Sequence, residues 1–251
     1  MNGPVNLKHR EWDVLETLAF RPGEDVPSDG LADDVWGGSP PASADVTLRG
    51  LVSDLRGKLG QDIITTVPGR RNGPKGSYRL NAHRDDIDVF AFEGRCQRGQ
   101  AHMRDEDWKR AHSVLTEAVA LCPETSLAGI PCGHALGRQL YYLDELLAQA
   151  HEARLEALTR MSLRESASAV PSLFRLTFSY PNRENPQRLL ILSLYRAGRH
   201  KDAVDAYLQW EKHVGEEIGA APGPAIKDLN NRITREDEAL LTEPLGYDTL
   251  R

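Results

Sequence analysis

The feature that most restricts the fold is a helical pattern that runs directly into a β-hairpin pattern. The helical segment carries one apolar stripe at helical spacing, made of Leu48, Val52, Leu55 and Leu59. Ser43 is suited to the N-cap of this helix, and Gly60 to its end. The β-branched segment 63–67 and the segment 77–80 then predict two strands, joined by a Gly-rich turn. A chain with this order must bring the hairpin back beside the helix.

Two further helices are predicted upstream of this segment. The first covers residues 7–20, and Arg21-Pro22-Gly23 ends it. We expect its apolar face to contain Val14, Leu15, Leu18 and Ala19, with Trp12 beside them. The second begins with Ser28 as N-cap and ends at Gly37-Gly38. Three helices followed by a hairpin predict a winged helix-turn-helix, in which the hairpin is the wing.

Charge is distributed unevenly along the chain, which has a net charge of −6. Residues 1–45 hold three basic and nine acidic side chains, residues 46–84 hold eight basic and two acidic, and residues 85–251 hold 20 basic and 26 acidic. The basic block therefore coincides with the third helix and the hairpin. Such a block is the electrostatic footprint that binding to double-stranded DNA requires.

The third helix has a second face, of small residues rimmed by arginines, that could approach a DNA groove closely. A solvated face on an ordinary core helix, and a solvated loop at the hairpin tip, are the alternative interpretations. The residues that we predict to contact DNA are Thr47, Arg49, Gly50, Ser53, Asp54, Arg56 and Lys58 on the helix, and Arg70, Arg71, Lys75 and Arg79 on the hairpin.

The rest of the chain reads as helical, with repeat-like spacing of small residues. One candidate repeat contains Gly99, Ala111, Ala118 and Pro123, and a second contains Leu190, Gly198, Ala203 and Tyr207. These positions match those at which tetratricopeptide-like repeats pack paired helices closely. Between them, residues 141–158 predict a long amphipathic helix, and residues 161–178 a helical stretch interrupted by Pro171. We therefore expect a mainly α protein with three parts: a winged helix over 1–84, an all-α helical-repeat domain over 85–235, and a mobile tail over 236–251.

Several blocks together resemble a known family. Trp12–Leu15, Leu31–Gly37, Leu51–Gly60 and Tyr78–Leu80 resemble the winged-helix domain of two-component response regulators, and resemble still more closely that of the actinobacterial antibiotic regulatory proteins. Leu194–Ala203, Tyr207 and Glu216–Pro224 resemble the bacterial transcriptional activator domain that follows it in the same regulators. The resemblance implies a pathway-specific activator that binds repeated half-sites in promoter DNA, with two copies on the DNA, and that contacts RNA polymerase and its σ factor. It also implies that the third helix reads the major groove.

The sequence departs from this family pattern in three places. Only the segment 4–7 could supply a strand before the first helix, where the family usually has two or three. Asp54 occupies a position at which relatives often carry arginine, and the segment between Gly69 and Tyr78 is longer than the family's usual turn. The missing strands and Asp54 favour an alternative, a protein-interaction scaffold that has lost specific DNA binding.

Other classes of function have little support in the sequence. The histidines are scattered, with no nucleophile–base spacing and no phosphate-binding loop, so we do not expect an enzyme. Cys122, Cys132 and His134 could form half of a metal site, but the partner ligands are missing, and we expect neither a metal nor a cofactor. With no apolar run of membrane-spanning length and no signal-peptide pattern, we expect a cytoplasmic, nucleoid-associated protein without a membrane partner.

Overall fold

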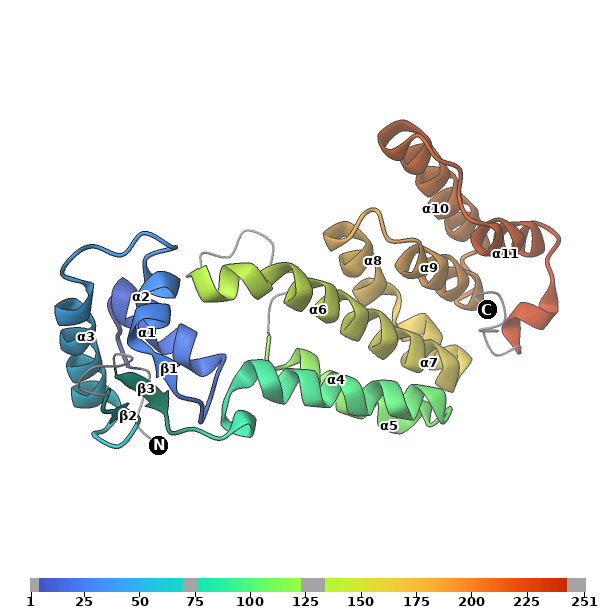
Figure 1. The fold of residues 1–251 in the computed structure, drawn as a ribbon. Helices are drawn as coiled ribbons and strands as arrows, with labels where there is room; N and C mark the ends of the chain where they lie inside the picture. Colours follow the sequence, from blue (N-terminus) through green and yellow to red (C-terminus); the bar gives the residue numbers. More distant parts are fainter. Residues whose placement is uncertain (1–4, 70–75, 123–133, 243–251) are drawn as a thin grey trace. The chain divides into compact units, whose positions relative to one another are not determined.

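The structure is a computed structural model that describes residues 5–69, 76–122 and 134–242, without the side chains of residues 134–136 and 138 (Figure 1). The chain divides into two compact units. The first contains residues 1–91 and 127–144, and the second contains residues 92–126 and 145–251. Each unit is described separately below.

The first unit has three helices that lie wholly within it and a small antiparallel sheet (Figure 1). It also includes the turn η1 (Arg84–Asp86) and the first residues of α4 (Asp88–Arg104) and α6 (His134–Met161). The three helices are α1 (His9–Ala19), α2 (Ser28–Val35) and α3 (Ala44–Leu59), and the strands are β1 (Val26–Pro27), β2 (Ile64–Val67) and β3 (Ser77–Leu80). The strand order is β1-β3-β2, and Val26 and Thr66 both lie opposite Tyr78. The predicted winged helix is confirmed, and the sheet holds the hairpin against the helices.

The core of this unit follows the predicted stripes. Leu18 of α1, Leu31 of α2, and Leu48 and Leu55 of α3 are fully buried in one cluster, which Ile64 of β2 joins. Gly60 ends α3 with a φ of 117°, a conformation that a side chain would strain. Burial of the stripe therefore fixes which face of α3 points outward.

Three local predictions in this unit are wrong. Trp12 is 52% exposed, whereas its neighbours Glu11 and Asp13 are buried, because Lys58 of α3 neutralises Glu11 and Arg10 of the same helix neutralises Asp13. Ser28 is the first residue of α2 rather than its cap, and its backbone N–H donates to the carbonyl of Gly76. Residues 5–7 form no strand. Instead, the two-residue strand β1 completes the sheet, and it is too short to leave an alternating pattern.

The second unit is all α in its described part (Figure 1). It contains α4 from Phe92 onward and α6 from Glu145 onward. The elements that lie wholly within it are α5 (Trp108–Val119), α7 (Leu163–Ser168), α8 (Val170–Ser179), α9 (Glu184–Arg196), α10 (His200–His213), the π-helical turn η2 (Val214–Ile218), α11 (Pro224–Thr234) and the turn η3 (Glu238–Leu241). Its core is contributed mainly by α8 to α11 and includes Leu173, Leu189, Ile191 and Ile226. The predicted helical-repeat fold is confirmed.

Both predicted repeats pair their helices through small residues. A Cβ at Gly99 of α4 would lie 2.5 Å from Leu115 Cδ2 of α5, so only glycine permits this approach. Ala111 and Ala118 of α5 are fully buried, as is Ala203 of α10. Gly198 turns α9 into α10 with a φ of 74°. Pro123 of the first repeat lies outside the described residues.

Two details of this unit differ from expectation. Pro171 lies in the first turn of α8, where backbone N–H groups have no acceptor within the helix. The lack of an N–H in proline therefore costs no helical hydrogen bond, and Pro171 starts a helix instead of interrupting one. The segment after Arg235 begins with η3, in which Leu240 is buried and its carbonyl accepts a hydrogen bond from Arg196 Nε at 2.9 Å. Residues 236–242 are therefore anchored to the core, and the remainder of the predicted tail lies outside the described residues.

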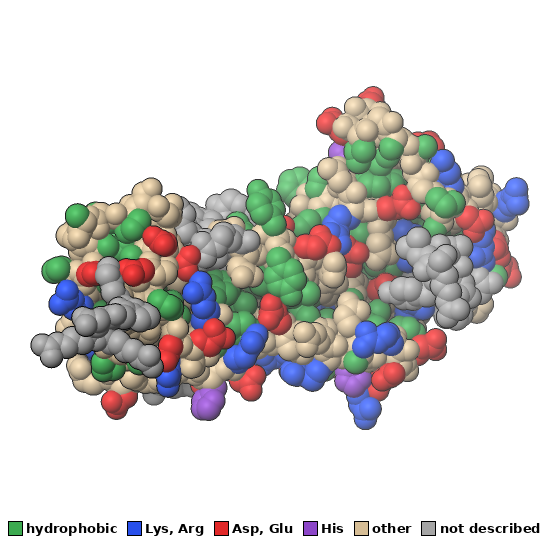
Figure 2. Space-filling view, viewed as in Figure 1, with side chains coloured by type: hydrophobic (Ala, Val, Ile, Leu, Met, Phe, Trp, Pro, Cys, Tyr) green, Lys and Arg blue, Asp and Glu red, His purple; other side chains and the backbone are tan. Residues whose placement is uncertain are grey.

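Basic and acidic side chains are intermixed on the face drawn in Figure 2. Across the described ranges, no helix combines the length and the apolar character needed to cross a bilayer.

Candidate nucleic-acid interface

The outer face of α3 consists of small and polar residues. Thr47, Gly50 and Ser53 are exposed along it, and Val46 beside them is 67% exposed. A Cβ built on Gly50 meets no atom within 4 Å. The same is true of Gly57, which lies about two helical turns further along the same face. Nothing in the described protein therefore requires glycine at these positions, although glycine inside a helix costs about 0.5–1 kcal/mol relative to alanine. The absence of bulk there leaves room for an external partner.

Arg49 is the exposed cation at the edge of this face. Its Nε donates to the backbone carbonyl of Asp45, one turn earlier, at 3.1 Å. This bond orients the side chain along the helix. In the described part of the chain, its terminal Nη atoms donate no hydrogen bond, so they can bind an oxygen atom of a partner.

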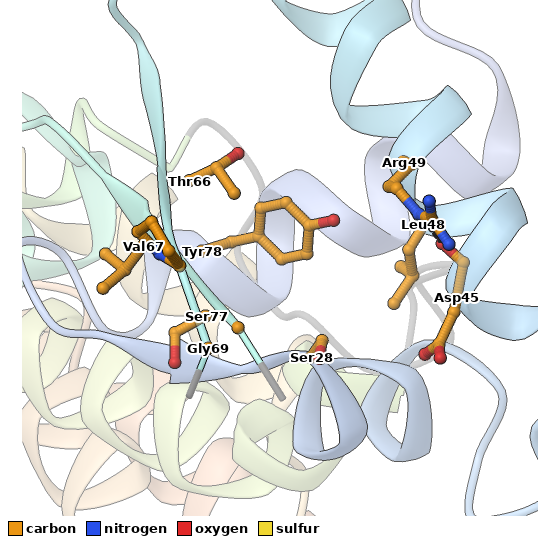
Figure 3. Close-up of a pocket in the computed structure, with 11 residues that line it drawn as sticks. Ser28, Asp45, Leu48, Arg49, Thr66, Val67, Gly69, Ser77 and Tyr78 are labelled. Carbon is orange, nitrogen blue, oxygen red and sulfur yellow. Dashed lines mark hydrogen bonds between the residues drawn. The ribbon is translucent and has the colours of Figure 1, made fainter. Parts of the chain in front are cut away.

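A cavity of about 290 Å³ opens between α3, the hairpin and the start of α2 (Figure 3). Its walls include Arg49 and Asp45 from α3, Thr66 from β2, Tyr78 from β3 and Ser28 from α2. The cavity thus joins the outer face of α3 to the base of the wing.

Tyr78 is the most deeply placed polar side chain of this cavity. The residue is only 6% exposed, yet its hydroxyl points across the cavity toward the α3 wall that carries Arg49 (Figure 3). Within the described ranges the hydroxyl makes no hydrogen bond. Burial raises the pKa of Tyr78, against the opposing charges of Arg49 and Arg56, so the hydroxyl is a neutral donor at physiological pH. A guanidinium and a buried phenol facing one cavity can together hold an anionic oxygen.

Three of the predicted DNA-binding cations are bound within the unit itself. Arg56 donates from Nε and Nη2 to the carbonyl of Ile64, at 2.9 and 2.6 Å, and from Nη2 to Thr66 Oγ1 at 2.9 Å. It therefore ties α3 to β2. Arg79 donates from Nε to Asp25 Oδ1 at 2.7 Å, which ties β3 to the segment before β1.

Lys58 is the third cation bound internally. Its Nζ lies 2.5 Å from Oε2 of Glu11 and also donates to the carbonyl of Asn6 at 3.2 Å. Its side chain therefore turns toward α1 and away from the small-residue face of α3. Each of these cations already donates to an internal acceptor. To contact a phosphate, the cation would have to give up that hydrogen bond or share its donors between the two acceptors.

The other predicted site residues lie as follows. Asp54 is half-exposed, and its Oδ2 is 4.0 Å from Lys8 Nζ, so its negative charge is only partly offset. Arg70, Arg71 and Lys75 lie outside the described residues. The structure thus brings Thr47, Arg49, Gly50 and Ser53 together on one outward face, while Arg56, Lys58 and Arg79 are directed to internal partners.

Sequence reasoning missed the polar residues that line the cavity. Tyr78, Thr66 and Ser28 are brought together by strand pairing and by the Ser28–Gly76 hydrogen bond. The only signal in the sequence was the position of Tyr78 in the strand that follows the basic tip. Its depth could not be read from that position, because it depends on β1, which was not predicted.

No metal site is formed by the described side chains. In that part of the chain, no group of three or more histidine, cysteine or acidic side chains is arranged to hold an ion. Cys132 lies outside the described residues, and the side chain of His134 is not described. Burial raises the pKa of the Cys96 thiol to about 12, so this cysteine is an inert core residue.

A winged helix-turn-helix followed by paired-helix repeats defines a class, the modular transcriptional regulators. Residues 2–70 match the family described as "Transcriptional regulatory protein, C terminal", and residues 87–234 match the "Bacterial transcriptional activator domain". The chain therefore belongs to the actinobacterial antibiotic regulatory protein family.

Individual relatives support this membership. The chain is 29% identical over 245 residues to "Regulatory protein DnrI" of Streptomyces peucetius, covering 94% of this chain and 87% of that protein. It is 30% identical over 227 residues to "Regulatory protein AfsR" of Streptomyces griseus, covering 90% of this chain but only 22% of the relative.

A solved structure is similar as well. The structure described as Mycobacterium tuberculosis EmbR in complex with a low affinity phosphopeptide matches with a TM-score of 0.75 and 25% identity, over 92% of this chain and 60% of that chain. This family and these relatives are regulators of transcription, so the protein is a transcriptional regulator and not an enzyme. The chain spans about a fifth of AfsR and three fifths of the EmbR chain, so activities of those larger proteins are not transferred to it.

Proposed function

We propose that the protein is a sequence-specific DNA-binding activator of antibiotic biosynthesis genes, acting in the cytoplasm at the nucleoid. The outer face of α3 enters the major groove, and the hairpin contacts the adjacent backbone. The observation that carries this proposal is the cavity between α3 and the wing, which is lined by Arg49 and Tyr78, with the Tyr78 hydroxyl pointing toward the wall that carries Arg49. A backbone phosphate bound there would fix the register of α3 on the duplex.

Roles within this proposal differ among the predicted site residues. Thr47, Gly50 and Ser53 approach base edges, and Arg49 binds a phosphate or a base at the rim. The tip cations Arg70, Arg71 and Lys75 supply contacts that do not depend on sequence. Arg56, Lys58 and Arg79 act mainly by holding α1, α3 and the wing in place. Asp54 repels phosphate, although it can accept a hydrogen bond from a cytosine amino group.

Specific binding requires more than one copy of the protein. One winged-helix module buries only about 600–1,000 Å² on DNA, so useful specificity needs two modules on repeated half-sites. By analogy with its family, the protein contacts RNA polymerase and its σ factor from such a site. We assign residues 1–84 to DNA binding, residues 85–235 to the activator domain, and residues 236–251 to a tail, of which residues 236–242 are held to the core.

The test is equilibrium binding of the full chain to promoter DNA from its own gene neighbourhood, measured by fluorescence anisotropy between 50 and 200 mM salt. A scrambled duplex of equal length and composition is the control. If Arg49 and the three tip cations each contact one phosphate, the log–log salt slope is about −3 to −4 per bound copy. We expect the promoter to bind at least ten times more tightly than the scrambled duplex at every salt concentration.

A second candidate is an interaction scaffold that has lost specific DNA binding. The internal hydrogen bonds of Arg56, Lys58 and Arg79, together with Asp54 on the outer rim, favour it. The same titration separates the two functions. Equal affinity for promoter and scrambled DNA, or no binding at 50 mM salt, supports the scaffold and refutes the activator proposal.

A further inference from the structure

Helix α3 begins with a valine that the fold does not use. Val46 lies in the first turn of α3 and is 67% exposed. It is the only large apolar side chain exposed on α3, a helix that lies entirely within the described range 5–69. Valine is also a poorer helix former than alanine, because its branched side chain loses rotamer freedom in a helix. Neither core packing nor helix propensity therefore accounts for a valine at this position.

Val46 lies at the start of the small-residue face of α3. A spacing of four residues places Gly50 next to it on the same face. Side chains of a helix lean toward its N-terminus, so a side chain at position 50 would lean toward Val46. Gly50 carries none, and a Cβ built there meets no protein atom within 4 Å. The γ-methyl groups of Val46 are therefore open to a partner that approaches this face.

The hydrogen-bond donors of Val46 and of its neighbour Thr47 are turned inward. The backbone N–H groups of these two residues donate to the carbonyl of Ser43, at 3.1 and 3.0 Å. The hydroxyl of Thr47, which is also an exposed residue, donates to the same carbonyl at 3.1 Å. Neither residue therefore has a donor left for a phosphate or a base. What this turn of α3 offers to a partner is mainly methyl groups, held in place by the branched side chain of Val46 and by the hydrogen bond of Thr47.

Methyl groups of this kind match one feature of the major groove. Among the four standard bases of DNA, only thymine carries a methyl group on its major-groove edge, and apolar side chains distinguish thymine by contact with it. Recognition helices contact base edges through their N-terminal residues, and Val46 and Thr47 lie at that end of α3. We propose that Val46, flanked by Thr47, contacts the C5-methyl group of a thymine in each promoter half-site. This inference rests on the proposed function and adds a base preference to it, together with a specificity-determining residue, Val46.

The experiment replaces thymine by uracil in the promoter duplex, one position at a time. Uracil pairs as thymine does and lacks only the C5-methyl group. Binding of the full chain is measured by fluorescence anisotropy, with the promoter and scrambled duplexes of the salt titration as references. At one thymine or more in each half-site, we expect uracil to weaken wild-type binding about three- to fivefold, which corresponds to the loss of one buried methyl group.

Three variants connect this response to α3. Val46→Ala should fold at least as stably as wild type, bind the promoter about three- to fivefold more weakly, and no longer distinguish thymine from uracil at that position. Thr47→Ser keeps the hydroxyl but removes the methyl group, and should bind the promoter about threefold more weakly. Leu208→Ala, which shortens a 52% exposed leucine of α10, is the matched control and should change neither the affinity nor the response to uracil.

Two results would overturn the inference and leave the proposed function intact. The first is a wild-type chain that prefers the promoter to the scrambled duplex but is weakened by uracil at no position. The second is the same response to uracil in Val46→Ala as in wild type. Equal affinity of the wild-type chain for promoter and scrambled DNA would instead refute the proposed function, and this inference with it.

Discussion

Lys58 Nζ at the end of α3 lies 2.5 Å from Oε2 of Glu11 in α1, and the Glu11 side chain has no exposed surface. The same oxygen accepts a hydrogen bond from the backbone N–H of Lys8 at 2.7 Å. A lysine in a basic block is normally assigned to phosphate contact. Here it neutralises a buried carboxylate and fixes the angle at which α3 is presented.

The first prediction concerns the acid stability of the first unit. The hydrogen bond from Lys58 lowers the pKa of Glu11, with a further contribution from the N–H of Lys8. A carboxylate whose pKa is lower in the folded state stabilises that state above its unfolded pKa, near 4.5, and loses this contribution as pH falls through the folded pKa. We expect the stability of the wild-type chain to decline below about pH 4.5, and the decline to be shallower in Glu11→Gln.

Urea unfolding from pH 3 to pH 7 measures this effect. Lys58→Met should destabilise the unit at pH 7, because it leaves a buried carboxylate without its cation. Lys201→Met is the control, since its ion pair with Asp205 lies on the surface of α10. Equal stability losses in the two lysine variants would contradict the structural role of Lys58.

The second prediction separates two arginines of α3 that look alike in the sequence. Arg49→Ala should weaken binding to promoter DNA by roughly 1–3 kcal/mol and leave unfolding unchanged, because its Nη atoms serve no described internal contact. Arg56→Ala should lower the free energy of unfolding by roughly 1–3 kcal/mol, because it removes three hydrogen bonds that tie α3 to β2. Anisotropy titration and urea unfolding of both variants measure the two effects. The assignment fails if Arg56→Ala unfolds like wild type or Arg49→Ala binds like wild type.

The different roles of these arginines show how far the sequence alone could lead. Helix α3, its buried stripe and the hairpin were predictable because periodicity and β-branched residues determine them locally. The function of each cation was not, because Arg56 meets Ile64 and Lys58 meets Glu11 only after the chain has folded back. In the sequence these residues differ little, because all of them are basic side chains on one helix. Their separate roles become visible only from the tertiary contacts that each one makes.

The same limit applies to the missed strand and to the helix face of α1. Strand β1 has two residues, one of them Pro27, so neither alternation nor propensity could indicate it. Trp12 was placed near the core by hydrophobicity, whereas Glu11 and Asp13 occupy that side because Lys58 and Arg10 neutralise them. In the second unit, small-residue spacing did predict the helix pairs. Close contacts such as that of Gly99 with Leu115 admit only a small residue, so the requirement can be recognised in the sequence itself.

The third prediction tests the cavity beside the wing. Tyr78→Phe removes a hydroxyl that faces the cavity and has no hydrogen-bond partner in the described protein, so we expect stability to be unchanged or slightly raised. If the hydroxyl donates to a phosphate, DNA affinity should fall by roughly 1.5–3 kcal/mol, since the acceptor is charged. Tyr207→Phe is the matched control, because its hydroxyl donates to Glu211 at 3.0 Å in the second unit. It should lose stability without losing DNA affinity. Wild-type DNA affinity in Tyr78→Phe would remove the hydroxyl from the interface.

The fourth prediction compares two glycines of α4. Gly99→Ala places a Cβ 2.5 Å from two atoms of Leu115 and should destabilise the repeat by roughly 1–3 kcal/mol. Gly94→Ala meets only the end of the flexible Arg98 side chain, at 3.6 Å, and should stabilise the same helix by about 0.5–1 kcal/mol. Thermal and urea unfolding measure both. Changes of the same sign in the two variants would be inconsistent with close packing of α4 on α5.

The last prediction joins stability to function at Gly50. A Cβ at this position meets no protein atom within 4 Å, and the residue lies inside α3, so Gly50→Ala should stabilise the unit by about 0.5–1 kcal/mol. The added methyl group projects from the face that we propose to approach base edges, so DNA binding should weaken by roughly 1–3 kcal/mol through steric overlap. Gly94→Ala provides the control for helix stabilisation far from this face. Because the two effects at Gly50 have opposite signs, general damage to the fold cannot mimic them. A variant that gains stability and keeps full DNA affinity would show that α3 does not enter the groove along this face.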